Sequence, residues 1–213
     1  MGEVKRTYYD SGELKEEWFE INGMKEGEWK KYCVNGELEE ICNYVNEKLE
    51  GEYKTYYDIG QLYQIGNFIN GIQEGECKRY YKNGQLWNIV NYVNGKQEGE
   101  CKYYYENGQL ESISNYINGK SEGKSKRYHP NGQVFYIYNC VNGIQEGEQK
   151  SYYENGQLKS IENYVNGMIE GEQKEYYENG KLKKITMINN HNNHNNRCIN
   201  KIKNFFNFIS SKL

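Results

Sequence analysis

Proline, aliphatic side chains and long apolar runs are all scarce in this chain of 213 residues. Proline occurs once, and Leu, Val and Ala are few, whereas Tyr (23) and Gly (23) are abundant. No apolar run approaches the ~20 residues that a membrane-spanning helix needs. A chain this polar cannot fill one deep core, so we expect many shallow, half-covered surfaces instead.

Signals for export, disulfide formation and nucleic-acid binding are also missing. Residues 1–6 carry no apolar stretch, so we expect no secretory signal and a cytoplasmic protein. The net charge of -3 provides no field that would attract nucleic acid. The cysteines form no C-x-x-C pair and are expected to be free thiols; they are Cys33, Cys42, Cys77, Cys101, Cys140 and Cys198.

An internal repeat of 24 residues is the main feature of the sequence. A turn dipeptide recurs at this spacing from Ser11-Gly12 to Asn179-Gly180, without insertion or deletion. A second glycine series, Glu-Gly, recurs from Glu26-Gly27 to Glu170-Gly171. The segments between these glycines are too short for helices and rich in Tyr, Ile and Val, which favours strands. Each repeat is therefore predicted to be one β-hairpin.

The single proline indicates the turn type. Pro130 stands directly before Asn131-Gly132, where a two-residue turn would require an N–H that proline lacks. In a three-residue loop it occupies position i+1 of a type I turn, and Gly132 takes the left-handed bulge position. We expect this loop in every repeat.

The loop in turn predicts which residues share a face. In the sixth full repeat it pairs Tyr152 with Leu158 and places Tyr164 on their face, with Tyr153, Ile161 and Val165 opposite. Both faces then mix apolar and polar residues, so we expect a single-layer sheet without an obvious inside. Hairpins that advance by two strand spacings, ~9.6 Å per repeat, predict an elongated all-β antiparallel array over residues 1–188.

The unit resembles a known family. The pattern G-E-x-K-x-Y-Y-x-N-G-x-L, followed by N-Y-V-N-G, is similar to the bacterial-type variant of the MORN repeat, which is found in YwqK-like antitoxins. Local departures are Ile59 in place of Asn, Glu47 in place of Gly, and Lys124 in place of Glu. The resemblance implies a β-hairpin array used for protein–protein contact, with lipid binding proposed for some members.

Two columns of repeated residues are candidate interaction surfaces. The lysines, among them Lys54, Lys78, Lys102 and Lys150, could bind a polyanion or an acidic membrane. We favour the alternative that each neutralises the Glu two residues earlier. The tyrosines, among them Tyr56, Tyr80, Tyr104 and Tyr152, could form an aromatic platform, but cross-strand packing is favoured.

The sequence offers little for catalysis or metal binding. His191, His194 and Cys198 have a spacing that zinc could use, but they lie in an Asn-rich tract typical of a flexible linker, residues 189–197. A Glu or Lys that recurs in every unit serves the unit rather than a unique site. We therefore expect no enzyme activity, no cofactor and no metal.

The segment 198–213 departs from the period. Its apolar residues follow a 3-4-3-4 spacing that predicts an amphipathic helix; they are Ile199, Ile202, Phe206, Ile209 and Leu213, with Phe205 alongside. This helix could cap the last strand, bind a membrane surface, or dock a partner, including a second copy of the chain.

The function expected from these features is a non-enzymatic scaffold or protein-binding module. One alternative is antitoxin-like sequestration of a partner protein, which the family resemblance implies. Another is a peripheral membrane tether that uses the lysine column and the C-terminal helix. End-to-end or helix-mediated homodimers are further possibilities.

Overall fold

The computed structural model describes residues 2–189, which form one antiparallel sheet of 22 strands. Six units supply two long strands and one strand of two residues, whereas in the unit before them β3 is a single strand of nine residues. The bounds are β1 Glu3–Tyr8, β2 Leu14–Ile21, β3 Met24–Tyr32, β4 Leu38–Val45, β5 Lys48–Leu49, β6 Gly51–Tyr56, β7 Leu62–Ile69, β8 Ile72–Gln73, β9 Gly75–Tyr80, β10 Leu86–Val93, β11 Lys96–Gln97, β12 Gly99–Tyr104, β13 Leu110–Ile117, β14 Lys120–Ser121, β15 Gly123–Tyr128, β16 Val134–Val141, β17 Ile144–Gln145, β18 Gly147–Tyr152, β19 Leu158–Val165, β20 Met168–Ile169, β21 Gly171–Tyr176 and β22 Leu182–Ile188.

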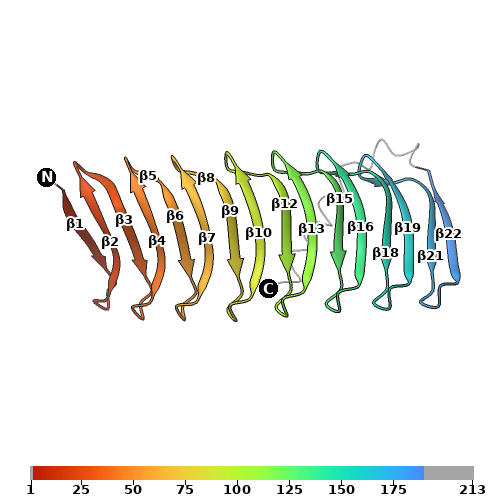
Figure 1. Cartoon of the computed structure of the whole chain (residues 1–213), viewed down its shortest axis with the longest axis horizontal. Coiled ribbons are helices and arrows are strands. Elements are labelled where there is room, and N and C mark those ends of the chain that lie inside the picture. The colour runs from red at the N-terminus through yellow and green to blue at the C-terminus, as the bar shows by residue number, and fades with distance from the viewer. Residues whose placement is uncertain (1, 190–213) are drawn as a thin grey trace.

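The strands follow one another as a meander, so the spatial order is the order of the chain (Figure 1). Within the sixth unit, six residue pairs join the long strands β18 and β19. Consecutive units are joined by two pairs between their long strands, as between β16 and β18, and by two further pairs beside the second turn, as between β19 and β20. The predicted all-β array of antiparallel hairpins is confirmed, and residues 2–189 contain no helix. The predicted linker beyond residue 189 and the predicted helix over residues 198–213 lie outside the described residues.

The first turn of each unit has the predicted geometry. The amide of Gly156 donates to the Tyr153 carbonyl over 2.9 Å, and the amide of Tyr153 donates to the Gln157 carbonyl over 2.9 Å. Gly156 has a φ of 80°, which is the left-handed bulge position that the glycine was expected to fill. The loop of Pro130 makes the same two bonds, so the interpretation based on this proline is confirmed.

The second turn is a different kind of hairpin. Asn166 and Gly167 both have positive φ, 52° and 76°, as a two-residue type I′ turn requires. Glu47 replaces the glycine in one unit and still adopts a φ of 63°, which is a strained conformation for a residue with a Cβ.

The Glu-Gly glycine is a bulge rather than a turn. Gly171 has a φ of 83°, and the Glu170 amide donates to the Asn163 carbonyl over 2.8 Å, so the chain continues along the same edge of β19. The bulge divides the returning strand into β20 and β21. Bulges of this kind bend a strand and increase its twist.

The predicted face assignment is wrong in part, because a second irregularity changes the side-chain alternation. Tyr152 pairs with Leu158 as expected, but Ser151 pairs with Ser160, which leaves Lys159 as an extra residue. One extra residue reverses the face of everything that follows it. Ile161 and Val165 therefore share the face of Tyr152, and Tyr164 lies on the other face.

The corrected register separates two faces of different character. The repeated face carries the columns in which nearly every unit has the same residue type, those of Glu148, Lys150, Tyr152, Leu158 and Ile161 in the sixth unit. The variable face carries columns whose residue type changes from unit to unit. In the sixth unit these columns contain Gln149, Ser151, Ser160, Glu162 and Tyr164.

The buried residues lie on the variable face, so the expectation of a sheet without an inside is wrong. Every residue of the described chain with a buried side chain belongs to this face: Trp29, Cys42, Cys77, Asn88, Val90, Cys101, Ser125, Cys140 and Gln149. Val90, Cys101 and Ser125 have no exposed surface. Side chains of neighbouring units on one strongly bent face cover one another, which produces a core without a second layer.

Repeated side chains bond each unit to the next. The hydroxyl of Tyr153 donates to the Tyr176 carbonyl over 2.8 Å, and equivalent bonds start at Tyr9, Tyr57, Tyr81 and Tyr105. At the same place His129 Nε2 is 3.1 Å from the Tyr152 carbonyl, so this nitrogen carries the proton.

Two further bonds between units explain why other columns repeat. The carboxylate of Glu146 accepts the amide of Asn166 over 2.9 Å, so the Glu before each bulge caps the next type I′ turn. The side-chain amide of Asn155 donates a hydrogen bond from Nδ2 to the backbone carbonyl of Glu178 over 3.3 Å. Ile59 cannot make this last bond, which is the structural consequence of that departure from the pattern.

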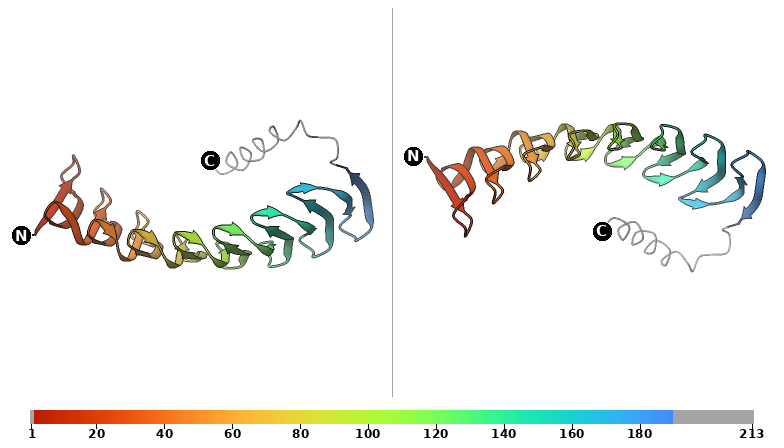
Figure 2. Two further views of the ribbon diagram at one scale, coloured as in Figure 1. Left: turned by 90° about the horizontal axis from the view of Figure 1, so that it is seen from above. Right: turned by 90° about the horizontal axis from the view of Figure 1, so that it is seen from below.

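The array is long and bowed. Figure 2 looks along the strands and shows the units side by side in a curved row, with both ends of the array bending towards the same side. Consecutive strands ~4.8 Å apart give a length on the order of 70 Å.

We therefore expect small-angle X-ray scattering to give a radius of gyration above the ~17 Å of a compact domain of this size. The reason is that no described strand folds back on the sheet to form a second layer. A scattering profile that fits a compact sphere would contradict the architecture.

Candidate interaction surface

The lysine column proposed as an anion site lies on the repeated face and is neutralised there. Lys78, Lys102 and Lys150 each place Nζ 2.6–2.7 Å from the carboxylate of the Glu two residues earlier. Lys54 pairs with Glu52 in the same way. The hydrogen bond that the Lys78 ammonium donates to Glu76 raises the pKa of this lysine. The pairing of these lysines with the Glu two residues earlier, which the sequence analysis favoured, is present in the structure.

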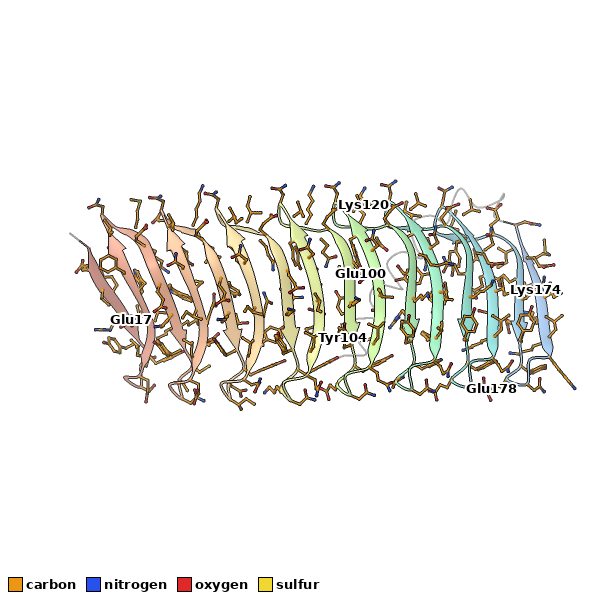
Figure 3. All side chains as sticks on the ribbon, viewed as in Figure 1. Glu17, Glu100, Tyr104, Lys120, Lys174 and Glu178 are labelled. Atoms are coloured by element: carbon orange, nitrogen blue, oxygen red, sulfur yellow. The ribbon has the colours of Figure 1, made fainter. Side chains whose placement is uncertain are left out.

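The tyrosine column packs across the strands as predicted. Tyr56, Tyr80, Tyr104 and Tyr152 are each paired with the leucine or equivalent residue of the adjacent strand, and all are half-buried. In Figure 3, Glu100 and Tyr104 lie along β12, between the row of type I′ turns near Lys120 and the opposite row of turns near Glu178. On the repeated face these lysine and tyrosine side chains therefore already have partners within the chain.

One unit departs from this neutral pattern. Lys124 stands where the other units have Glu, so Lys126 has no acidic partner in its column. Both side chains are exposed, and within residues 2–189 neither makes an ion pair. The departure identified in the sequence therefore leaves two unpaired cations on the repeated face of the fifth unit.

The variable face presents a different chemistry in each unit. Its most central column runs Trp29, Tyr53, Cys77, Cys101, Ser125, Gln149, Gln173. The column beside it runs Lys31, Thr55, Arg79, Tyr103, Arg127, Ser151, Glu175. Since the hairpin geometry is the same in every unit, the fold does not account for this variation. The face therefore presents a distinct pattern of shape and charge along its length.

Polar atoms without hydrogen-bond partners are buried on the same face. In the described chain eight residues have such atoms, and all eight belong to the variable face: Trp18, Trp29, Thr55, Gln73, Asn88, Ser121, Ser125 and Gln149. Both amide atoms of Asn88 are unpaired although the residue is 1% exposed. An unpaired buried polar group costs roughly 1–3 kcal/mol, so these atoms favour water or a ligand that brings matching groups.

Two open depressions lie on the C-terminal half of the variable face. The larger has a volume of about 540 Å³, and its walls combine aromatic, cationic and acidic groups; they include Arg127, Phe135, Tyr136, Ser160, Glu162 and Lys183. The smaller, of about 320 Å³, adjoins it at Arg127 and Tyr136 and reaches Cys140. The Arg127 guanidinium lies 5.9 Å from the centre of the Phe135 ring.

Burial on the variable face raises the pKa of several of its acidic groups. Loss of hydration raises the pKa of Tyr44 and of Tyr116 to about 12, so both phenols remain hydrogen-bond donors at neutral pH. The same cause raises the pKa of Glu40 and, to about 12, that of the Cys42 thiol. Thiols with such a pKa are poor nucleophiles, which fits a packing role for the cysteines.

The remaining sequence candidates are placed as follows. Cys33, Cys42, Cys77, Cys101 and Cys140 are free thiols. No group of three or more metal-binding side chains occurs in the part of the chain that the structure describes. His191, His194 and Cys198 lie outside that part, as do Ile199 and the other apolar residues of the C-terminal segment. Among residues 2–189 no helix is long and apolar enough to span a membrane.

The sequence candidates thus lie on the repeated face, and the variable face was missed. Its signal was present in the sequence, in the columns that change while their neighbours stay constant. Tyr103 and Tyr104 illustrate the difficulty, because they are adjacent and chemically alike but point to opposite faces. The faces could be assigned only once it was known that one strand of each hairpin carries one extra, unpaired residue beside the first turn.

Comparison with known proteins agrees with this architecture. Seven consecutive segments match the sequence profile described as "MORN repeat variant", at residues 25–46, 49–70, 73–94, 97–118, 121–142, 145–166 and 169–190. These segments together make up more than half of the chain.

Solved structures and curated sequences add little. The crystal structures titled TcdB2-TccC3-Cdc42 and TcdB2-TccC3 are 13% and 12% identical, with a TM-score of 0.20 in both cases. The matches cover 85% of this chain but 13% and 14% of those chains, so this chain spans about an eighth of their length. A comparison with curated sequences gave no match. On the seven consecutive profile matches, the chain belongs to the MORN repeat variant family.

Proposed function

We propose that this chain is a non-enzymatic module that binds a segment of a partner protein on its variable face. MORN repeats are generally protein or membrane interaction modules without catalytic activity. The observation that carries the proposal is the confinement of unpaired buried polar atoms to one face, which also holds most of the columns whose residue type varies. A surface that only had to fold would not need either feature.

The chemistry of the variable face suits a polypeptide. Aromatic side chains such as Phe135 and Tyr136 provide apolar contact, and Arg127 provides charge and hydrogen-bond donors beside them. Arg and Tyr are enriched among the residues that dominate protein interfaces. Acidic groups, including Glu162 and Glu175, line the same depression, so the bound segment is expected to carry both signs of charge.

A membrane tether through the lysine column has weaker support. Each of Lys54, Lys78, Lys102 and Lys150 already has a carboxylate partner, which removes most of the positive potential that an acidic lipid surface would require. Antitoxin-like sequestration is a narrower form of the main proposal. It adds the expectation that the partner loses its own activity in the complex.

Two adjacent residues offer a matched test of which face binds. Arg127 and Lys126 are both exposed, but Arg127 lies on the variable face and Lys126 on the repeated face. After capture of the partner from the native cell, binding of each purified variant is measured by calorimetry. We expect Arg127→Glu to weaken binding roughly tenfold or more, because interfacial arginines frequently dominate affinity.

Lys126→Glu makes the same charge change and is expected to leave the affinity unchanged. Thermal unfolding should show that both variants fold like the parent. If Lys126→Glu weakens binding and Arg127→Glu does not, the repeated face is the binding surface and the proposal is wrong.

A further inference from the structure

An aromatic cage surrounds one lysine at the N-terminal end of the variable face. Lys25 places Nζ 5.1 Å from the ring centre of Trp18, 5.3 Å from that of Trp29 and 5.4 Å from that of Tyr44. Trp29 is 7% exposed, and the indole N–H groups of both tryptophans are buried without a hydrogen-bond partner. These four residues are referred to below as the cage and its lysine.

Three adjacent strands bring the cage together. Trp18 of β2 and Trp29 of β3 are directly paired across the strands, and Tyr44 of β4 is paired with Gly27, two residues before Trp29. Lys25 lies near the start of β3, directly after the turn that joins β2 to β3. The side chain therefore reaches the rings from the edge of the face.

The repeat architecture does not require this arrangement. The column of Lys25 continues without another cation, and the Trp18 and Trp29 columns contain no other tryptophan. The residues that follow Lys25 in its column are Leu49, Gln73, Gln97, Ser121, Gln145 and Ile169. The hairpin folds equally with any of these, so the cage is a local feature with its own chemistry.

The rings favour a cation that is weakly hydrated. A ring quadrupole attracts an ammonium group, and the attraction grows when the cation gives up little water on entry. Lys25 makes no ion pair within residues 2–189, so the cage holds it by ring contacts without help from a carboxylate. An unmethylated ammonium is strongly hydrated. An N-methylated ammonium loses less on entry and can displace it.

We propose that this cage receives a lysine-type side chain, and best an N-methylated one, from the protein segment bound on the variable face. Lys25 fills the cage when the segment is absent and leaves when it binds. The inference rests on the proposed function, because it names one side chain of the segment and the place where that side chain is bound.

The test uses the full chain and small probes. The substitution Trp87→Phe removes the third tryptophan and leaves the two cage tryptophans as reporters, and their fluorescence is followed during titration. The probes are the Nα-acetyl amides of Nε-trimethyl-lysine, lysine and norleucine. We expect saturable binding of the trimethyl-lysine probe, weaker binding of lysine and no response to norleucine, because norleucine lacks the charge.

Removal of the internal lysine should strengthen the response. Lys25→Ser is expected to bind the trimethyl-lysine probe roughly tenfold more tightly, since no internal cation then competes. Lys48→Ser, at an exposed lysine of β5, is the matched control and should bind like the parent. Tyr44→Leu leaves both reporters in place and should weaken binding by a similar factor.

Three results would overturn the inference. They are no saturable response in the Lys25→Ser variant, an equal response to norleucine, or binding to phosphatidylcholine vesicles in preference to the lysine probes, which would identify a lipid headgroup instead. Arg127 is about 100 residues away in sequence, four units along the face, so its variant tests the proposed function separately. If the cage fails these assays, the result of the Arg127 test still decides the proposed function.

Discussion

Replacement of Val90 by aspartate is expected to unfold the central units of the array. Val90 has no exposed surface and is paired with Cys77, which is also buried. A carboxylate at this place would lose its hydration and gain no cation, at a cost of about 4 kcal/mol or more. Domains of this kind have a total stability of about 5–15 kcal/mol. The melting temperature, followed by circular dichroism, should therefore fall by roughly 10 °C or more.

Val93→Asp provides the control on the same strand. Val93 is 41% exposed, so the same chemical change leaves the charge in water and should alter stability by no more than about 0.5 kcal/mol. Hydrogen exchange should show that the Val90→Asp variant loses protection first in β9, β10 and β12, because each unit depends on its neighbours. Equal melting temperatures for the two variants would mean that the variable face is not the core.

Deletion of 12 residues is expected to be far more damaging than deletion of 24. Removal of residues 99–122 joins Glu98 to Gly123 and keeps every column in phase. Each remaining strand then meets the kind of neighbour that it has in the full chain. We expect a folded, shorter array whose melting temperature falls by only a few degrees, because one interface between units is lost.

Removal of residues 99–110 joins Glu98 to Glu111 and moves every later column out of phase. Glu111 would stand where Gly99 has a φ of 75°, a conformation that strains a residue with a Cβ. The side-chain hydrogen bonds that Tyr81 and Asn83 donate to the next unit would also lose their acceptors, because the accepting carbonyls belong to deleted residues. Light scattering after size exclusion should show aggregation of this variant. A monomer as stable as the 24-residue deletion would contradict the account of register.

The role of the C-terminal segment, residues 198–213, is a separate prediction. Deletion of residues 198–213 addresses the expected cap, and its outcome decides between capping, docking and membrane binding for a region outside the described residues.

Local chemistry was sufficient to predict the repeating unit. The spacing of 24 residues, the Asn-Gly dipeptides and Pro130 together indicated strands, hairpins and a type I turn with a glycine bulge, and the structure has each of them. These features depend on a few neighbouring residues, since a missing N–H or a left-handed glycine acts within one turn. The pairing of a column lysine such as Lys102 with the Glu two residues earlier is local in the same sense.

The assignment of faces was decided by the tertiary structure. An extra residue such as Lys159 arises where two paired strands differ in length by one residue, and it changes which way all later side chains of its strand point. The bulge at Gly171 shifts the register by two residues and leaves the alternation as it was. Burial likewise depends on how strongly the paired strands bend. The sequence alone therefore determined a β-hairpin array of 24-residue units. Only the packed sheet decided that the varying residues form its core and its candidate binding surface, because long-range pairing sets the phase of every strand.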